Sequence, residues 1–400
     1  MSGMKGQARP AVCIVVENLP VPLDRRVWRE ACALRDAGFR VSVVCPKGAG
    51  PFRGRYQNLD GIEIYRHGGL EASGVLGYVV EYAMALTAEL YLSLKIFVRT
   101  RYRILQACNP PDTIFLIGLL LRPFGVRFIF DHHDLAPELF ESKFGDAGLL
   151  HRLTLWLERC SFTAARVSIA TNESFKEIAV TRGGKRPEDV FVVRNCPDLA
   201  STNRVPASPD LKSANSLLVV YVGFMGSQDG LPLLIEAIEH IVRNGKRQDV
   251  QFILLGGGTE LPMLRSLVAE RQLESFVTFT GRVPYDEVIR YLAQADVGVA
   301  PDPKTAMNDK STMIKIMEYM AFGVPVVLFD LKEGRRVAES AALYARPNDP
   351  IDFAKQITTL LDSPELRRQL GACGRRRVEE RLNWDSEKAS LIEAYERALR

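Results

Sequence analysis

Short apolar runs alternate with longer amphipathic stretches along most of this chain, and the alternation predicts its elements. The run from Ala11 to Val16 predicts a buried strand, residues 27–39 predict a helix that ends near Gly38, and residues 40–46 predict a second strand. A strand, a helix and a strand in this order form a βαβ unit, which requires a parallel sheet with helices on its faces. The chain therefore begins as an α/β domain.

The same alternation starts again in the second half of the chain. Residues 216–224 (SLLVVYVGF) predict a strand, and a helix follows from Leu231 after a glycine-bearing loop. Residues 196–216 are rich in Pro, Ser, Asn and Asp and show no periodicity, as is typical of a linker. The pattern predicts two α/β domains, residues 1–197 and 198–381, followed by a last helix within residues 382–400.

The stretch from Pro301 to Phe329 carries the most information about chemistry. Its middle predicts a helix that Ser311 or Thr312 caps, followed by a buried strand, VPVVLF. Ser311, Lys315 and Glu318 share one face of this helix. A helix N-terminus beside Lys310 or Lys315 suits a diphosphate, and a carboxylate two turns later suits ribose hydroxyls. An ordinary solvated Lys–Glu pair would give the same spacing.

Polar residues also follow the strand predicted at residues 127–130 (RFIF). Asp131, His132, His133 and Asp134 lie at its carboxyl end, where open α/β sheets hold their ligands. Because neighbouring side chains of an extended segment point in opposite directions, one histidine can face the ligand while the other packs. The remaining histidines show no ligand spacing relative to this pair, so the sequence predicts no metal site.

The segment KIMEYMAFGVPVV (315–327) resembles the nucleotide-sugar signature of the retaining glycosyltransferases of family 4, which have the GT-B fold. That signature has two glutamates separated by seven residues, then a small-residue turn and a Pro-Val strand. Glu318 matches the second glutamate, which binds ribose in the family, whereas Lys310 occupies the position of the first. The HD-x-x-PE pattern at residues 133–138 resembles a bacterial surface-polysaccharide branch of the family.

The resemblance implies two Rossmann-like domains that face a cleft, with the nucleotide on the second domain and the acceptor on the first. It implies that the last helix crosses back to the first domain, and that His133 lies near the transferred sugar with Asp131 and Asp134 beside it. Phe224 and Asp229 stand where the family usually has an arginine and a lysine for the diphosphate. The donor-site candidates are Gly223, Gly226, Arg282, Val283, Lys310, Ser311, Lys315 and Glu318.

Charge is distributed unevenly over an otherwise ordinary globular composition. The net charge is +4, and residues 1–197 hold 26 Lys and Arg against 20 Asp and Glu. This mild excess favours an anionic partner such as a membrane surface but is too small to indicate nucleic acid. Asn18 and Arg25, after the first strand, are acceptor-side candidates, and Arg99, Arg101 and Arg103 follow a long apolar helix (74–98) that could lie on a membrane or in the core.

Seven scattered cysteines without a C-x-x-C pair indicate reduced thiols, and no apolar run reaches the length of a membrane span. We therefore expect a cytoplasmic protein, peripheral at the inner face of the cell membrane. The resemblance implies retaining transfer from a nucleotide-diphosphate sugar to a saccharide or a polyprenyl-diphosphate-linked acceptor, with no cofactor. Because the sequence has no D-x-D motif, we expect this transfer to need no metal ion. The alternatives are a nucleotide-sugar epimerase, a non-catalytic partner with the same fold, and a soluble transferase that makes a small glycoside.

Overall fold

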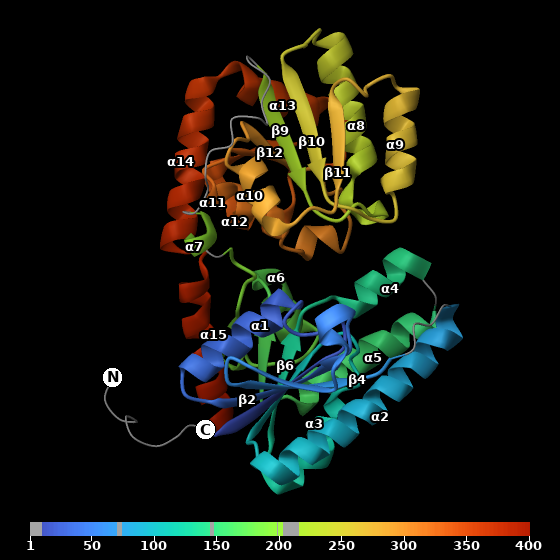
Figure 1. The fold of residues 1–400 in the computed structure, drawn as a ribbon, viewed down its shortest axis with the longest axis vertical. Coiled ribbons are helices and arrows are strands. Elements are labelled where there is room, and N and C mark those ends of the chain that lie inside the picture. Colours follow the sequence, from blue (N-terminus) through green and yellow to red (C-terminus); the bar gives the residue numbers. More distant parts are fainter. Residues whose placement is uncertain (1–9, 70–73, 145–147, 198, 203–215) are drawn as a thin grey trace. The chain divides into compact units, whose positions relative to one another are not determined.

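The computed structural model describes residues 10–69, 74–144, 148–197, 199–202 and 216–400, and these form two compact units (Figure 1). The first domain comprises the chain up to Asn195 together with Glu387–Arg400, and the second domain comprises Cys196–Ser386. Each domain is a parallel or mostly parallel sheet covered by helices.

The first domain is built on an eight-stranded sheet in the order β3-β4-β2-β1-β5-β6-β7-β8, in which only β3 is antiparallel to its neighbour. All six residues of β1 are buried, as expected for a central strand covered on both faces. The strands are β1 (Ala11–Val16), β2 (Arg40–Pro46), β3 (Tyr56–Leu59), β4 (Ile62–His67), β5 (Ile104–Cys108), β6 (Arg127–His132), β7 (Val167–Ala170) and β8 (Val190–Val192).

The helices of the first domain cover both faces of this sheet. They are α1 (Arg25–Asp36), α2 (Gly74–Thr100), α3 (Phe115–Leu121), α4 (Ala136–Phe144), α5 (Leu149–Ala164) and α6 (Glu173–Thr181), joined by most of α15 (Trp384–Leu399). The return of the last helix to the first domain is confirmed, because Ser390 donates to the Val192 carbonyl and Arg397 pairs with Asp189. Helix α3 is only partly buried, because Leu116, Leu119 and Leu120 are exposed.

The second domain is built on a six-stranded parallel sheet in the order β11-β10-β9-β12-β13-β14. Its strands are β9 (Leu217–Val222), β10 (Val250–Leu255), β11 (Val277–Gly281), β12 (Val297–Ala300), β13 (Val326–Phe329) and β14 (Ala342–Ala345). Its helices are α7 (Leu199–Thr202), α8 (Leu231–Glu239), α9 (Leu261–Glu270), α10 (Tyr285–Leu292), α11 (Ile314–Ala321), α12 (Lys332–Ala338), α13 (Pro350–Asp362) and α14 (Pro364–Glu380). The linker predicted at residues 196–216 lies mostly outside the described residues.

Helix α11 starts later than the sequence predicts. It begins at Ile314 with Met313 as its N-cap residue, so the expected cap by Ser311 or Thr312 is wrong. Ser311 instead closes the preceding 3₁₀ turn, Asn308–Lys310, by donating its hydroxyl to the Met307 carbonyl over 2.9 Å. The local hydrogen bond competes with capping, as it often does for serine.

Candidate active site

A buried ion pair stands at the carboxyl end of β6 in the first domain. Asp131 is fully buried, and its Oδ1 lies 2.9 Å from Nη2 of Arg26, whose side chain is 6% exposed. Arg26 also donates to the Val193 carbonyl and to Oδ1 of Asn195. Although burial raises the pKa of Asp131, Arg26 and His133 together hold it below the usual range for aspartate.

His133 packs against this ion pair. It is the most exposed of the three residues, with 11% of its side chain accessible to solvent. Its Nε2 lies 2.7 Å from Oδ2 of Asp131 and 2.9 Å from Nε of Arg26. Burial lowers the pKa of His133, but the Asp131 carboxylate outweighs burial and the net shift is upward. The upward shift favours the imidazolium form, in which Nε2–H donates to Asp131 while Nδ1–H is available to donate to a ligand oxygen.

The last helix, α15, reaches the same network through the side chain of Gln106. The Tyr395 hydroxyl donates to Oε1 of Gln106, and Nε2 of Gln106 donates to Oδ2 of Asp131 over 2.9 Å and to Oε2 of Glu30 over 2.7 Å. Burial and then the Asp131 charge raise the pKa of Glu30 to about 8. Glu30 is therefore mostly protonated at neutral pH, which leaves Asp131 as the main counter-charge of Arg26.

Asn109 fixes the backbone on which His133 stands. Its Oδ1 accepts from the amides of His133 (2.6 Å) and Asp134 (3.2 Å), and its Nδ2 donates to the Asp134 carbonyl. These bonds hold the segment after β6 against β5. The structure thus places Asp131 and His133 together, while Asp134 contributes its backbone to the same turn.

His132 points away from the network, as the alternation of side chains along a strand predicts. It is fully buried, its Nε2 lies 3.2 Å from Oε1 of Glu158, and its ring packs on Phe162 and Phe175. Arg182 in turn pairs with Glu158. His132 is therefore part of the core.

The acceptor-side candidates lie in the loop after β1 and at the first residue of α1. Asn18 and Arg25 are exposed, and Asp24 caps α1 by accepting from the Val27 amide. The residue that enters the network is Arg26, one position later than the sequence reasoning chose. The signal was available in the spacing of Arg26 and Glu30, which places both on one helix face.

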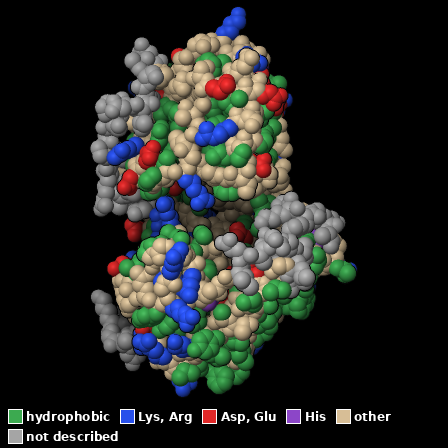
Figure 2. All heavy atoms as spheres, turned by 45° about the vertical axis from the view of Figure 1, so that its right-hand side comes forward, with side chains coloured by type: hydrophobic (Ala, Val, Ile, Leu, Met, Phe, Trp, Pro, Cys, Tyr) green, Lys and Arg blue, Asp and Glu red, His purple; other side chains and the backbone are tan. Residues whose placement is uncertain are grey.

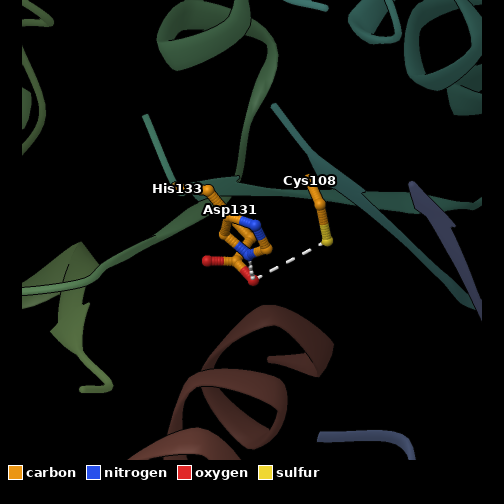
Figure 3. Close-up of side chains that lie close together, drawn as sticks. All are labelled: Cys108, Asp131 and His133. Atoms are coloured by element: carbon orange, nitrogen blue, oxygen red, sulfur yellow. Dashed lines mark hydrogen bonds and ion pairs between the residues drawn. The ribbon is translucent and has the colours of Figure 1, made fainter. Parts of the chain in front are cut away.

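Two groups of potential metal ligands occur among the described residues. Cys108, Asp131 and His133 converge within 4.8 Å (Figure 3), but Asp131 is already satisfied by Arg26 and Gln106, and burial raises the pKa of the Cys108 thiol well above its usual value. Glu17, His67 and Glu89 form the second group, in which burial and Glu17 raise the pKa of Glu89 to about 8. In this second group the imidazole of His67 already has a carboxylate partner, Glu17, 3.0 Å away.

In the second domain, glycine turns follow β9 and β10 at the carboxyl edge of the sheet. A Cβ atom on Gly256 would lie 1.8 Å from the Gly223 carbonyl oxygen, so the two turns pack backbone against backbone. Gly230, with φ of 68°, is in the left-handed conformation directly before α8. Gly223 and Gly226 lie in the first of these turns, and their amides already donate within the protein, to the Leu255 carbonyl and to Oδ2 of Asp229.

Lys315 does not point a free ammonium at this turn. Its Nζ lies 2.9 Å from Oδ1 of Asp302 and 3.8 Å from Oδ1 of Asp229, and it sits over the ring of Tyr221. Burial lowers the pKa of Lys315, but Asp302, Tyr319 and Asp229 outweigh it and raise it. The two carboxylates compensate the lysine, so the expectation that Lys315 supplies surplus charge to a diphosphate is not supported by its surroundings.

Arg282 is better placed to supply such charge. It directly follows β11, is exposed, and lies beside the second glycine turn, where a Cβ on Gly257 would be 3.3 Å from its Cγ. Within the described part of the chain its guanidinium has no carboxylate partner. Val283 follows it and packs against the core of the domain.

Glu318 and Lys310 lie on either side of the start of α11. Glu318 is half-buried in the second turn of the helix, and Lys310 is half-buried in the 3₁₀ turn before it. Ser311, between them, is committed to Met307. The carboxylate is therefore held on a rigid element beside the edge that carries Gly223, and Lys310 belongs to the loop.

The basic residues 99–103 lie at the opposite edge of the first sheet from Asp131. Arg103 directly precedes β5, whereas Asn18 and His133 follow strands that run in the same direction. Arg99 pairs with Glu63 over 3.1 Å, and Arg101 stacks on Phe97. The structure thus separates the acceptor-side candidates from the basic cluster. None of the described helices has both the length and the apolar content required to cross a membrane.

Two α/β domains, each built on a parallel or mostly parallel sheet with polar residues at the carboxyl ends of its strands, are the architecture of a GT-B protein. Residues 23–196 match the family described as glycosyl transferase 4-like domain, and residues 216–363 match glycosyl transferases group 1. These findings support a place among the GT-B glycosyltransferases of the group 1 and 4-like type.

Similar proteins include α-D-kanosaminyltransferase of Streptomyces kanamyceticus, 28% identical over 38% of this chain and 38% of the relative. A putative colanic acid biosynthesis glycosyltransferase of Escherichia coli is 32% identical over 31% of this chain and 30% of the relative. The match therefore spans well under half of these curated relatives. The solved structure of the Anabaena protein HepE in complex with UDP has a TM-score of 0.70 at 16% identity and covers 97% of this chain and all of that one, which shows a shared fold.

Proposed function

We propose that this chain is a retaining glycosyltransferase that moves a sugar from a nucleotide-diphosphate sugar to a saccharide or a lipid-linked acceptor in the synthesis of a cell-envelope polysaccharide. A uridine nucleotide is the first choice of donor and a guanosine nucleotide the second. The observation that carries the proposal is the carboxyl edge of the second sheet. Two interlocked glycine turns, the exposed Arg282 and the half-buried Glu318 occur together there.

The donor diphosphate would lie at the glycine turns, beside the exposed side chain of Arg282. Arg282 supplies the compensating charge, since the ammonium of Lys315 is neutralised by Asp302 and Asp229. Glu318 accepts hydrogen bonds from the ribose, the role that the matching glutamate has in family 4. The complex of HepE with UDP favours uridine as the nucleoside.

A front-face transfer fits the first domain better than a double displacement. Double displacement needs a free carboxylate nucleophile close to an acid–base partner, and Asp131 is buried and bonded to Arg26, Gln106 and His133. In the front-face route the leaving diphosphate oxygen takes the acceptor proton while His133 donates Nδ1–H to a sugar oxygen. The chain contains no D-x-D sequence, and we propose transfer without a metal ion.

We further propose a cytoplasmic location with contact at the inner face of the membrane, which a polyprenyl-diphosphate-linked acceptor would require. Exposed apolar side chains on α2, α3 and α5 support this contact, among them Tyr91, Val98, Leu120 and Trp156. The relative from Escherichia coli named for colanic acid biosynthesis is consistent with a polysaccharide product.

We expect UDP to raise the melting temperature of the purified protein, and Arg282→Ala to weaken that effect. Saturation at a hundred times Kd stabilises by about 2.7 kcal/mol. Loss of a charge-assisted hydrogen bond weakens UDP binding by roughly 10-fold or more and leaves uridine binding unchanged. Differential scanning fluorimetry measures the melting temperature and titration calorimetry measures the affinity, each with UDP, GDP, ADP and uridine.

Arg290→Ala on α10 is the matched control, because Arg290 is also an exposed arginine of the second domain. The donor assignment is wrong if Arg290→Ala and Arg282→Ala weaken UDP binding equally. If no nucleotide shifts the melting temperature, a non-catalytic partner protein becomes the better interpretation. Conversion of the donor sugar without any acceptor would instead indicate an epimerase.

A further inference from the structure

A cavity of about 430 Å³ opens in the first domain at the sheet edge opposite to His133. It is formed where β6 and β7 begin and where α3, α5 and α6 end. Its charged lining residues are Arg122, Arg127, Arg166, Lys185, Arg186 and Asp189. Five cations face a single carboxylate, so the cavity carries a surplus of positive charge.

Two of these cations are already held by acceptors of the protein. Arg186 lies 2.6 Å from Oδ2 of Asp189, and Nζ of Lys185 donates to the Ala165 carbonyl over 2.6 Å. The other three (Arg122, Arg127 and Arg166) are exposed and have no carboxylate partner in the part of the chain that the structure describes. Free guanidinium groups that converge on a cavity suit the oxygens of a phosphate.

The topology of the sheet explains why the arginines gather here. Arg103, Arg127 and Arg166 stand at the start of the neighbouring parallel strands β5, β6 and β7. The Arg127 amide donates to the Arg103 carbonyl and the Arg166 amide to the Phe128 carbonyl, both over 2.8 Å. The arginines therefore form a row along one edge, far from the carboxyl edge that holds Asp131.

A second hollow of about 490 Å³ adjoins the cationic cavity between α3 and α5, and the two share Arg122, Thr163 and Ala164. Phe115, Leu119 and Trp156 line the second hollow. Trp156 is 58% exposed and Phe124, next to Arg122 in the chain, is 66% exposed. Figure 2 shows that hydrophobic side chains gather on the face of this domain beside Lys and Arg side chains.

We propose that the cationic cavity binds the phosphate of an anionic phospholipid and that an acyl chain of this lipid lies in the adjoining apolar hollow. Charge complementarity selects the head group, and the continuity of cavity and hollow selects a lipid over a free phosphate. Surface arginines and an interfacial tryptophan are the combination expected at a membrane boundary. The inference deepens the membrane contact of the proposed function but does not depend on sugar transfer.

Flotation with vesicles tests this site. We expect the full chain to float with phosphatidylcholine vesicles that contain phosphatidylglycerol and not with phosphatidylcholine alone. Arg127→Gln/Arg166→Gln should weaken this partition by roughly 30-fold, since each basic residue near an anionic surface contributes about a factor of five. The control is Arg53→Gln/Arg55→Gln, which removes the same charge from exposed arginines elsewhere in the first domain.

Trp156→Ala tests the hollow, and we expect it to weaken partition while the response to glycerol phosphate in solution stays unchanged. Equal losses in the two double variants, or equal flotation with both vesicle types, would show unspecific adsorption and overturn the site. Stabilisation by glycerol phosphate without flotation would assign the cavity to a soluble phosphate and overturn the lipid. The melting shift with UDP is measured in every variant, and its retention separates failure of this site from failure of the donor site.

Discussion

Asp131→Ala lowers the free energy of unfolding of the first domain by about 3–5 kcal/mol and abolishes sugar transfer. The change leaves the guanidinium of Arg26, with 6% of its side chain exposed, without its main counter-charge. For a domain of this size the loss corresponds to a fall in melting temperature of roughly 6–20 °C. It also releases His133, whose Nε2 lies 2.7 Å from the deleted carboxylate.

Ionisation of Glu30 would bring the loss of unfolding free energy in Asp131→Ala toward the lower end of that range. Burial and then the Asp131 charge raise the pKa of Glu30 to about 8, so removal of Asp131 lets Glu30 ionise and compensate Arg26 in part. Its carboxylate is already 3.1 Å from Nε of Arg26. We therefore expect Asp131→Ala/Glu30→Gln to be less stable than the sum of the two single changes predicts, which a double-mutant cycle measures.

Glu173→Ala is the control for loss of an ion pair. Glu173 also pairs with an arginine, Arg194, over 2.9 Å, but its side chain is 47% exposed, so we expect at most about 1 kcal/mol. His133→Gln separates structure from chemistry, because it should remove activity with little effect on the melting temperature. If Asp131→Ala melts like the wild type, the proposed structural role of Asp131 is wrong.

The fold was predictable because both sheets are made of buried parallel strands, which appear in the sequence as short apolar runs. Glu318 could be located because the helix, the turn and the strand around it are contiguous. The pairing of Lys315 with Asp302 and Asp229 could not be predicted. Asp302 and Asp229 lie in loops after β12 and β9, and only the folded sheet, in which these two strands are neighbours, brings them together.

The first-domain site was predictable only in outline, for a similar reason. Asp131 and His133 follow from the end of a strand, but their partners Arg26 and Gln106 are more than 20 residues away in the chain, and Tyr395 comes from the last helix. The separation of Arg103 from the carboxyl edge was within reach of sequence reasoning. Arg103 precedes a strand, and in a parallel sheet residues before and after strands lie at opposite edges.

Glu318→Ala raises the KM for the donor by roughly 10- to 100-fold and changes kcat little. A carboxylate that accepts from ribose hydroxyls makes the same bonds in the ground state and in the transition state, so its loss removes uniform binding. Glu318→Gln keeps one acceptor oxygen, so its KM for the donor should lie between those of the wild type and Glu318→Ala. Initial rates across donor concentrations give the split, and Glu270→Ala, an exposed glutamate on α9, is the control.

A cycle with 2′-deoxy-UDP assigns the effect to the ribose. The wild type should bind UDP more tightly than 2′-deoxy-UDP, and Glu318→Ala should bind both nearly alike, because the partner of the hydroxyl is already gone. If the variant still prefers UDP by the same factor, another residue contacts the ribose, and the effect of Glu318→Ala comes only from a change in helix α11. Helix α11 begins only at Ile314, so the carboxylate stands in its second turn, one turn beyond the Lys315 ammonium that Asp302 holds. Under the proposed assignment Glu318 binds the nucleoside and Arg282 the diphosphate, so the two variants should fail with different ligands.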